Sequence, residues 1–153
     1  MRILIVEDDG ILAASLGMML EGSGHEVVGH AATVKTAMDL ARRHRPTLTL
    51  VDIDLGPGGS GIAAARGMRK HLGLTCLFVT DQVERARGAA DAALGMLAKP
   101  YTRDMVVAGV GAVEALMKNK PPGDLPDGLQ LFTDGSITAA VLDRKPAALG
   151  LEG

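Results

Sequence analysis

The chain has 153 residues, enough for one domain with a short addition, and 47% of them are hydrophobic, which is sufficient for a buried core. The formal net charge is -2 and charges of both signs are interspersed, so no clustered basic face for binding nucleic acid is expected. The sequence has a single cysteine, no signal-peptide layout and no apolar stretch of membrane-spanning length. We therefore expect a cytoplasmic protein that contacts neither nucleic acid nor a membrane.

Short apolar runs of strand length alternate with stretches of helical period over most of the chain. The sequence predicts strands over residues 2–6, 25–29, 48–52, 74–79 and 94–98, and helices over 10–21, 33–44, 62–71, 83–92 and 103–117. The glycine-rich residues 56–61 are expected to form a loop. Because a helix follows each strand, this alternation predicts an α/β fold with a parallel sheet covered on both faces.

The character of the sequence changes near residue 119. Residues 119–124 contain two prolines and a glycine and are expected to form a linker. Two short apolar patches follow, Leu129–Phe132 and Ile137–Leu142, which are expected to dock as a strand or a helical turn. This segment is too short to build its own core. The sequence therefore predicts one domain over 1–118, followed by a linker and tail over 119–153 that is not an independent domain.

Polar side chains follow four of the five predicted strands. The first strand ends in Glu7-Asp8-Asp9, the third in Asp52, the fourth in Thr80 and the fifth in Lys99. In a parallel sheet the carboxyl ends of the strands open onto one crevice, where such folds bind their ligands. We therefore expect these side chains to lie close together.

Carboxylates beside buried strands lose hydration and repel one another, and a bound cation relieves both effects. Magnesium suits this site because it prefers oxygen ligands and needs only one or two carboxylates besides water and phosphate oxygens. Lys99 adds an ammonium group and Thr80 adds a hydroxyl. An aspartate can act as a nucleophile toward phosphorus, and phosphoryl transfer needs mainly positioning and charge neutralisation. The predicted crevice could therefore hold a phosphoryl group.

Four segments of the chain resemble the receiver domains of response regulators in two-component signalling. They are residues 2–9 (RILIVEDD), 50–55 (LVDIDL), 78–80 (FVT) and 99–100 (KP), each at the end of a predicted strand. The resemblance covers about residues 1–118 and indicates a receiver of the single-domain type. It implies a flavodoxin-like (βα)5 fold, a doubly wound five-stranded parallel sheet with strand order 2-1-3-4-5.

The resemblance also implies roles for the polar residues. Asp52 would be the phosphoacceptor, Thr80 would hydrogen-bond the phosphoryl group, and Lys99 would pair with it. Such a protein is phosphorylated by a sensor histidine kinase or a histidine phosphotransfer protein and acts through protein contacts. It is a signalling phosphoacceptor in a two-component system or phosphorelay, and not an enzyme acting on other substrates. A homodimer through the fourth and fifth helices is a further expectation.

The same resemblance implies a magnesium site. Asp8 would bind Mg²⁺ directly and Glu7 through water, with Asp52 and the backbone carbonyl of Asp54 as further ligands. The acidic pair could instead be Asp8-Asp9. Its position relative to the strand end favours Glu7-Asp8 and leaves Asp9 to begin the first helix, where an acid suits the helix dipole.

Two positions depart from the family pattern. Met96 stands where receivers usually carry an aromatic residue that turns inward on phosphorylation, so the signal must be relayed in another way. Asp81 follows Thr80 where a small residue is usual, and its charge is expected to repel an incoming phosphoryl group. These departures favour an alternative, a degenerate receiver that binds a partner constitutively.

A second alternative is a phosphatase of the haloacid dehalogenase type. Asp52-Ile53-Asp54 matches the aspartate-x-aspartate motif of that family, in which one acid is the nucleophile and the other a general acid. That motif belongs on the first strand, whereas here it follows the third. The order of the motifs therefore favours the receiver.

Overall fold

The computed structural model describes residues 1–132 of the chain. The predicted apolar patch at Ile137–Leu142 lies outside the described residues. Within residues 1–132, no helix combines the length and the apolar character needed to cross a membrane.

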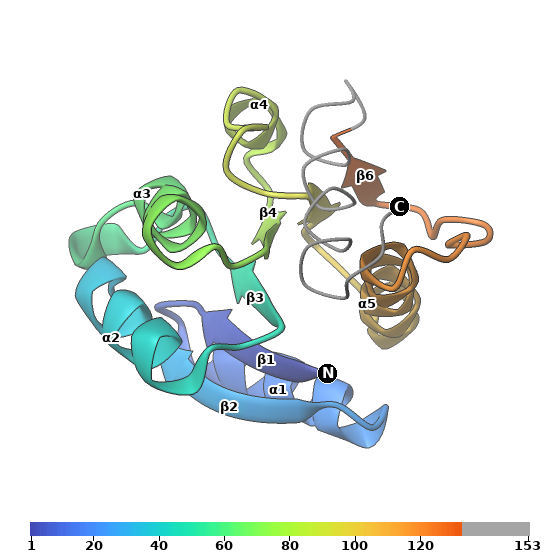
Figure 1. Cartoon of the computed structure of the whole chain (residues 1–153), viewed down its shortest axis with the longest axis horizontal. Coiled ribbons are helices and arrows are strands. Elements are labelled where there is room, and N and C mark those ends of the chain that lie inside the picture. Colours follow the sequence, from blue (N-terminus) through green and yellow to red (C-terminus); the bar gives the residue numbers. More distant parts are fainter. Residues whose placement is uncertain (133–153) are drawn as a thin grey trace.

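The core of the fold is one sheet of six strands in the order β2-β1-β3-β4-β5-β6 (Figure 1). The strands are β1 Arg2–Val6, β2 Glu26–Ala31, β3 Leu48–Val51, β4 Cys76–Thr80, β5 Gly95–Ala98 and β6 Leu129–Leu131. The first five are parallel, which confirms the predicted order 2-1-3-4-5. The predicted number of strands is one short, because β6 adds an antiparallel strand beside β5.

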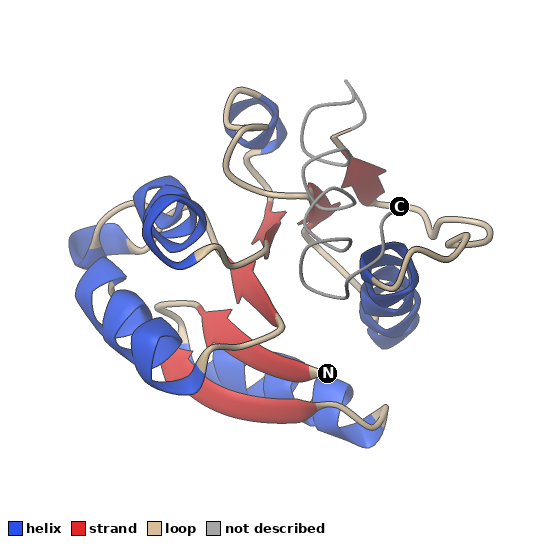
Figure 2. Ribbon diagram, viewed as in Figure 1, coloured by secondary structure: helices blue, strands red, loops and turns tan. Residues whose placement is uncertain are grey.

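Helices cover both faces of the sheet (Figure 2). They are α1 Gly10–Gly22, α2 Val34–His44, α3 Gly61–Gly67, α4 Val83–Arg87 and α5 Arg103–Met117. α1 contacts α5, and α2 contacts α3, so these two pairs form separate layers. A short 3₁₀ turn, η1 Gly56–Gly58, precedes α3, and a π-helical segment, η2 Met68–Leu72, continues it. The expected doubly wound architecture is thus present.

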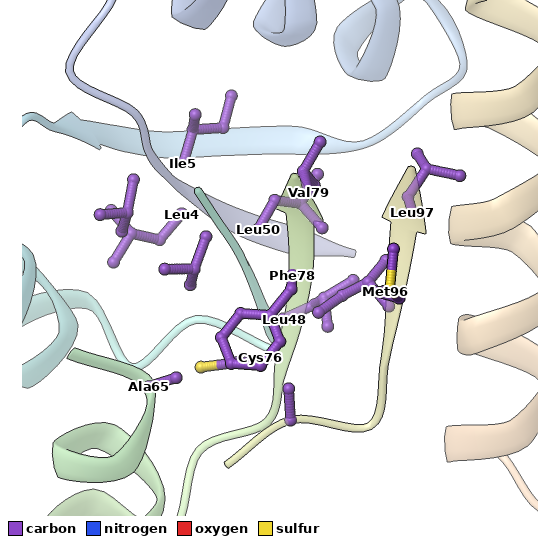
Figure 3. Packing of buried hydrophobic residues seen from close by; sticks show 14 of the residues in the cluster. Leu4, Ile5, Leu48, Leu50, Ala65, Cys76, Phe78, Val79, Met96 and Leu97 are labelled. Carbon is purple, nitrogen blue, oxygen red and sulfur yellow. The ribbon is translucent and has the colours of Figure 1, made fainter. Parts of the chain in front are cut away.

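The apolar runs form strands because both faces of the sheet are buried. Every residue of β3 and β4 is buried, as are Ile3 to Val6 of β1. Figure 3 shows apolar side chains from β1, β3, β4 and β5 packed around the sheet, with Ala65 of α3 beside them. Burial of such side chains contributes about 1.5–3 kcal/mol each. This packing fixes the positions of the strand ends.

Side-chain caps set the beginnings of four of the five α-helices in residues 1–132, α3 included. Asp9 Oδ1 accepts hydrogen bonds from the amides of Ile11 and Leu12 at 2.9 and 3.2 Å, so Asp9 begins α1 as expected. Thr33 and Thr102 cap α2 and α5 in the same way. These caps satisfy amides that have no partner within the helix.

The helix predicted over 83–92 is shorter than expected, because α4 ends at Arg87. Gly88 follows, and the small residues after it form turns that lead into β5. Asp91 in these turns is held by Arg66 of α3 through two hydrogen bonds of 2.8 and 2.9 Å. Glycine lowers helix propensity, and the bidentate contact with α3 favours the turn over a continued helix.

Candidate functional site

Three acidic side chains meet at the carboxyl ends of β1 and β3. The two strands are paired, with Val6 opposite Val51, and the amide of Asp52 donates a 2.9 Å hydrogen bond to the carbonyl of Val6. Glu7, Asp8 and Asp52 each offer a carboxylate oxygen, and these oxygens all lie within 4.8 Å of one another. The fold therefore brings together acids that lie more than forty positions apart in the sequence.

Lys99 supplies a positive charge to these acids. Its Nζ donates hydrogen bonds to Glu7 Oε1 at 2.9 Å and to Asp52 Oδ2 at 3.2 Å. The side chains of Lys99, Glu7 and Asp52 are only 19%, 7% and 12% exposed. The lysine follows β5, and its amide donates to the carbonyl of Thr80 at 2.9 Å, which aligns it with the end of β4. Charged hydrogen bonds at this level of burial are stronger than those on an open surface.

The shared charges shift two pKa values in this cluster. Burial lowers the pKa of Lys99, but its contacts with Glu7 and Asp52 outweigh burial and hold that pKa above its usual range. Loss of hydration raises the pKa of Asp8, and the nearby Glu7 and Asp54 raise it further. An acid whose pKa is raised by neighbouring acids gains from a cation.

Thr80 and Asp54 lie near the cluster but are turned to backbone partners. Thr80 is fully buried at the end of β4, and its Oγ1 accepts a 3.0 Å hydrogen bond from the amide of Gln82. Asp54 follows β3, and its Oδ1 accepts a 2.9 Å hydrogen bond from the amide of Gly56. The hydroxyl of Thr80 is therefore used at the start of α4 in this structure.

The contacts of Asp9 bear on the choice between the two acidic pairs. Its Oδ1 caps α1, while its amide donates a 3.2 Å hydrogen bond to Glu7 Oε2. Asp9 is thus engaged with the helix, whereas Glu7 and Asp8 gather with Asp52. The geometry favours Glu7-Asp8 as the acidic pair of the site.

A hollow of about 370 Å³ adjoins Lys99. Leu12, Asp81, Pro100 and Tyr101 line it together with the lysine. Tyr101 and Leu12 were not predicted as part of the site. The only signal for Tyr101 in the sequence is its place two residues after Lys99, and Leu12 reaches the hollow from α1, which the sequence alone does not indicate.

The residues of the cluster fit a magnesium ion. Glu7, Asp8 and Asp52 provide carboxylate oxygens, which Mg²⁺ prefers over nitrogen and sulfur ligands. Asp8 is exposed, so an ion could reach it while keeping waters. Lys99 bonds only Glu7 and Asp52 among these acids, which leaves Asp8 without a cationic partner in residues 1–132.

Comparison with known proteins places this geometry in a family. Residues 3–111 match the model of the response regulator receiver domain. The phyllosphere-induced regulator PhyR of Methylorubrum extorquens is 37% identical over 102 residues, which cover 65% of this chain and 38% of that protein. The transcriptional regulatory protein PdtaR of Mycobacterium tuberculosis is 36% identical over 106 residues, which cover 66% of this chain and 50% of that protein. The chain thus spans half or less of the length of these relatives.

Solved structures of response regulators also resemble this chain. A response regulator from Chloroflexus aurantiacus superposes with a TM-score of 0.68 at 30% identity, covering 74% of this chain and 97% of that one. The response regulator PhyR from Brucella abortus superposes with a TM-score of 0.63 at 34% identity, and the match covers 69% of this chain and 44% of that one. The family match covers most of the chain and contains every strand-end residue of the site. The chain therefore belongs to the response regulator receiver domain family.

Proposed function

We propose that Asp52 accepts a phosphoryl group from a phosphohistidine on a sensor histidine kinase or a histidine phosphotransfer protein, with Mg²⁺ as the helper ion. Receiver domains are signalling phosphoacceptors, and this chain's relatives are regulators. One observation carries the proposal: Lys99 reaches across from β5 to bond Asp52 and Glu7 within the acidic cluster. A charged lysine held beside a carboxylate at strand ends is suited to neutralising an incoming phosphoryl group.

The transfer step is a substitution at phosphorus. A carboxylate oxygen of Asp52 attacks the phosphorus, a new P–O bond forms, and the P–N bond to the histidine breaks. Its electron pair returns to the imidazole ring, which takes up a proton. Lys99 pairs with the transferred phosphoryl oxygens.

Glu7, Asp8, Asp52 and the backbone carbonyl of Asp54 would hold the magnesium ion. When bound, the ion supplies positive charge that offsets the charge of the carboxylates and the phosphoryl oxygens.

The experiment is intact-mass analysis after incubation of the full chain with Mg²⁺ and a small phosphodonor such as acetyl phosphate. We expect one phosphoryl adduct on the wild type and none on Asp52→Ala. Asp54→Asn is the matched control, because it retains the backbone carbonyl and should still be phosphorylated. Absence of an adduct with small donors and with candidate kinases would refute the proposal.

A degenerate receiver is the second candidate, and Asp81 favours it. Asp81 lines the hollow beside Lys99, where its charge opposes an approaching phosphoryl group. This candidate predicts no adduct and partner binding that Asp52→Ala does not change. Steady turnover of a generic phosphate ester would instead support the phosphatase alternative.

The remaining expectations belong to the same proposal. Output is expected through protein contacts in the cytoplasm, with residues 1–118 as the receiver domain and a homodimer through α4 and α5. Size-exclusion chromatography with and without the phosphodonor tests the dimer. A phosphorylation-independent elution volume would argue against a dimer controlled by the site.

A further inference from the structure

β6 covers the outer edge of β5. The two strands pair antiparallel, with Met96 opposite Gln130. Beyond the ends of this pairing, the amide of Ala98 donates to the carbonyl of Gly128 at 2.8 Å, and the amide of Phe132 donates to that of Leu94 at 3.0 Å. β6 lies at the far end of the sheet from β2 (Figure 1). An edge that would otherwise present unpaired backbone groups is thus occupied by the chain itself.

Two glycines are suited to this pairing. A methyl group on Gly95 would overlap the carbonyl oxygen of Gln130 and lie 3.0 Å from the Cα of Leu131. Gly128 has a φ of +85°, which side chains rarely adopt, and it lies against Met105 of α5. The lack of a side chain at position 95 therefore gives β6 room to pair with β5, and glycine at position 128 lets the chain turn into β6 without strain.

β6 is also tied to α4. Arg87, the last residue of α4, donates a 3.1 Å hydrogen bond from Nε to Oε1 of Gln130. At the other end of α4 no side chain of Gln82 caps the helix, and the amide of Gln82 donates to Thr80 Oγ1 at 3.0 Å. α4 has only five residues and buries only Ala86, so these terminal contacts contribute to fixing its position.

The chain just before β6 is also bonded to the residue next to the lysine of the site. Ala98, whose amide is bonded to Gly128, immediately precedes Lys99. Lys99 is in turn bonded to Glu7 and Asp52. Two routes therefore join the site to β6. One runs through the Thr80 hydroxyl, α4 and the side-chain contact between Arg87 and Gln130, and the other runs through the backbone at the end of β5.

We propose that β6 is a displaceable cover on the edge of β5, and that a phosphoryl group on Asp52 weakens its docking. The inference rests on the proposed function. A phosphoryl group competes for the hydroxyl of Thr80 and the ammonium of Lys99. Gln82 then loses its acceptor, α4 loosens, and the contact between Arg87 and Gln130 is lost.

This device accounts for Met96. The backbone of Met96 is paired with Gln130. A conformational change at the site could therefore reach the surface through the pairing of β5 with β6, without an aromatic side chain at position 96. Coupling is reciprocal: if phosphorylation weakens β6, removal of β6 must favour phosphorylation by the same factor.

The test is hydrogen exchange of the full chain, followed by mass spectrometry, with Mg²⁺ and with or without acetyl phosphate. Phosphorylation should speed exchange of the amides of Ala98 and Phe132 by a factor of about 5 to 150, the usual size of coupling between sites. The intact mass of the same sample reports the adduct. An adduct with unchanged or slower exchange overturns this inference and leaves the proposed function standing, whereas absence of an adduct both with acetyl phosphate and with candidate kinases overturns both.

Variants test the reverse direction. Gly95→Ala should displace β6 without phosphorylation, while Gly111→Ala on α5, where a methyl group meets no atom within 4 Å, is the matched control. Gln130→Ala removes only the contact with Arg87 and serves if Gly95→Ala does not fold. Both should speed exchange at Phe132 and raise the fraction phosphorylated at equilibrium with a limiting amount of a phosphohistidine donor, each relative to wild type. Faster exchange with an unchanged phosphorylated fraction would refute the coupling.

Discussion

The ammonium group of Lys99 lies 2.9 Å from Oε1 of Glu7, although 92 positions separate them in the sequence. The same nitrogen is 3.2 Å from Asp52 Oδ2, so Glu7 is its nearer partner. A phosphoryl group on Asp52 must therefore compete with Glu7 for this lysine. Glu7 thereby influences how readily the lysine turns toward a phosphorylated site.

Replacing this lysine should destabilise the chain. Lys99→Met leaves Glu7 and Asp52 without their cation, and we expect a loss of about 1–3 kcal/mol in the free energy of unfolding at neutral pH without Mg²⁺. Lys118→Met is the control, because Lys118 pairs with Glu114 through a side chain that is 61% exposed and should cost less than about 0.5 kcal/mol. Urea denaturation measures both. Equal losses would contradict the importance of the Lys99 contacts.

The pH dependence of this contribution has a definite sign. The pKa of Lys99 is raised above 10.5, so the folded chain holds this proton more tightly than the unfolded chain. The stabilisation is present at neutral pH and is lost as pH rises through the folded pKa. Wild type should therefore lose its advantage over Lys99→Met only in alkaline solution. A difference that vanishes near pH 7 would be inconsistent with this shift.

Removing a charge from Asp8 should have the opposite effect. Because the raised pKa of Asp8 reflects unfavourable ionisation, Asp8→Asn should raise the free energy of unfolding in EDTA at pH 7. The gain should be less than about 1 kcal/mol because Asp8 is exposed. It should also abolish stabilisation by Mg²⁺. Asp9→Asn is the matched control, since asparagine caps a helix as well as aspartate does and should leave the Mg²⁺ response intact.

Magnesium binding should depend on pH. With a raised pKa, Asp8 carries more bound proton in mildly acid solution than an ordinary aspartate, and Mg²⁺ must displace it. Affinity should therefore fall as pH is lowered, and binding should release protons. Calorimetry in buffers of different ionisation enthalpy measures this release. Binding that takes up protons or does not change with pH would refute a role for Asp8 as ligand.

An aromatic residue should not be tolerated at position 96. Met96 is 1% exposed in β5, so Met96→Tyr overpacks the core and should cost about 1–3 kcal/mol. Met18→Tyr is the control, because Met18 is 73% exposed on α1 and the change should be nearly neutral. Thermal denaturation compares them. A stable Met96→Tyr variant would show that the core has room for an aromatic switch.

The sequence predicts the sheet well because its strands are apolar on both faces. Runs such as Ile3–Val6 and Leu48–Val51 have no other favourable location, and their order follows from the alternation with helices. The sequence predicts the end of α4 five residues too late, since the alanines that follow favour a helix, whereas Gly88 and the contact between Arg66 and Asp91 favour the turn. Local pattern cannot anticipate a contact between distant side chains.

The site, like the fold, has features that the sequence predicts and features that it does not. Strand ends place Glu7, Asp8, Asp52 and Lys99 in one crevice, and the sequence already predicts that meeting. The pairing of Lys99 with Glu7, and the turn of the Thr80 hydroxyl toward Gln82, depend on side-chain torsions that strand periodicity does not specify.

The position of β6 bears on where the polypeptide can be cut for recombinant work. The family match ends at residue 111, and a fragment cut after residue 118 would retain every site residue. It would also lack β6, so the backbone donors and acceptors at the edge of β5 would be unpaired. The apolar residues that Leu129 and Phe132 now cover would become exposed. Such edges promote self-association and aggregation. A fragment that continues through Phe132 keeps the edge paired and is the better choice for soluble expression.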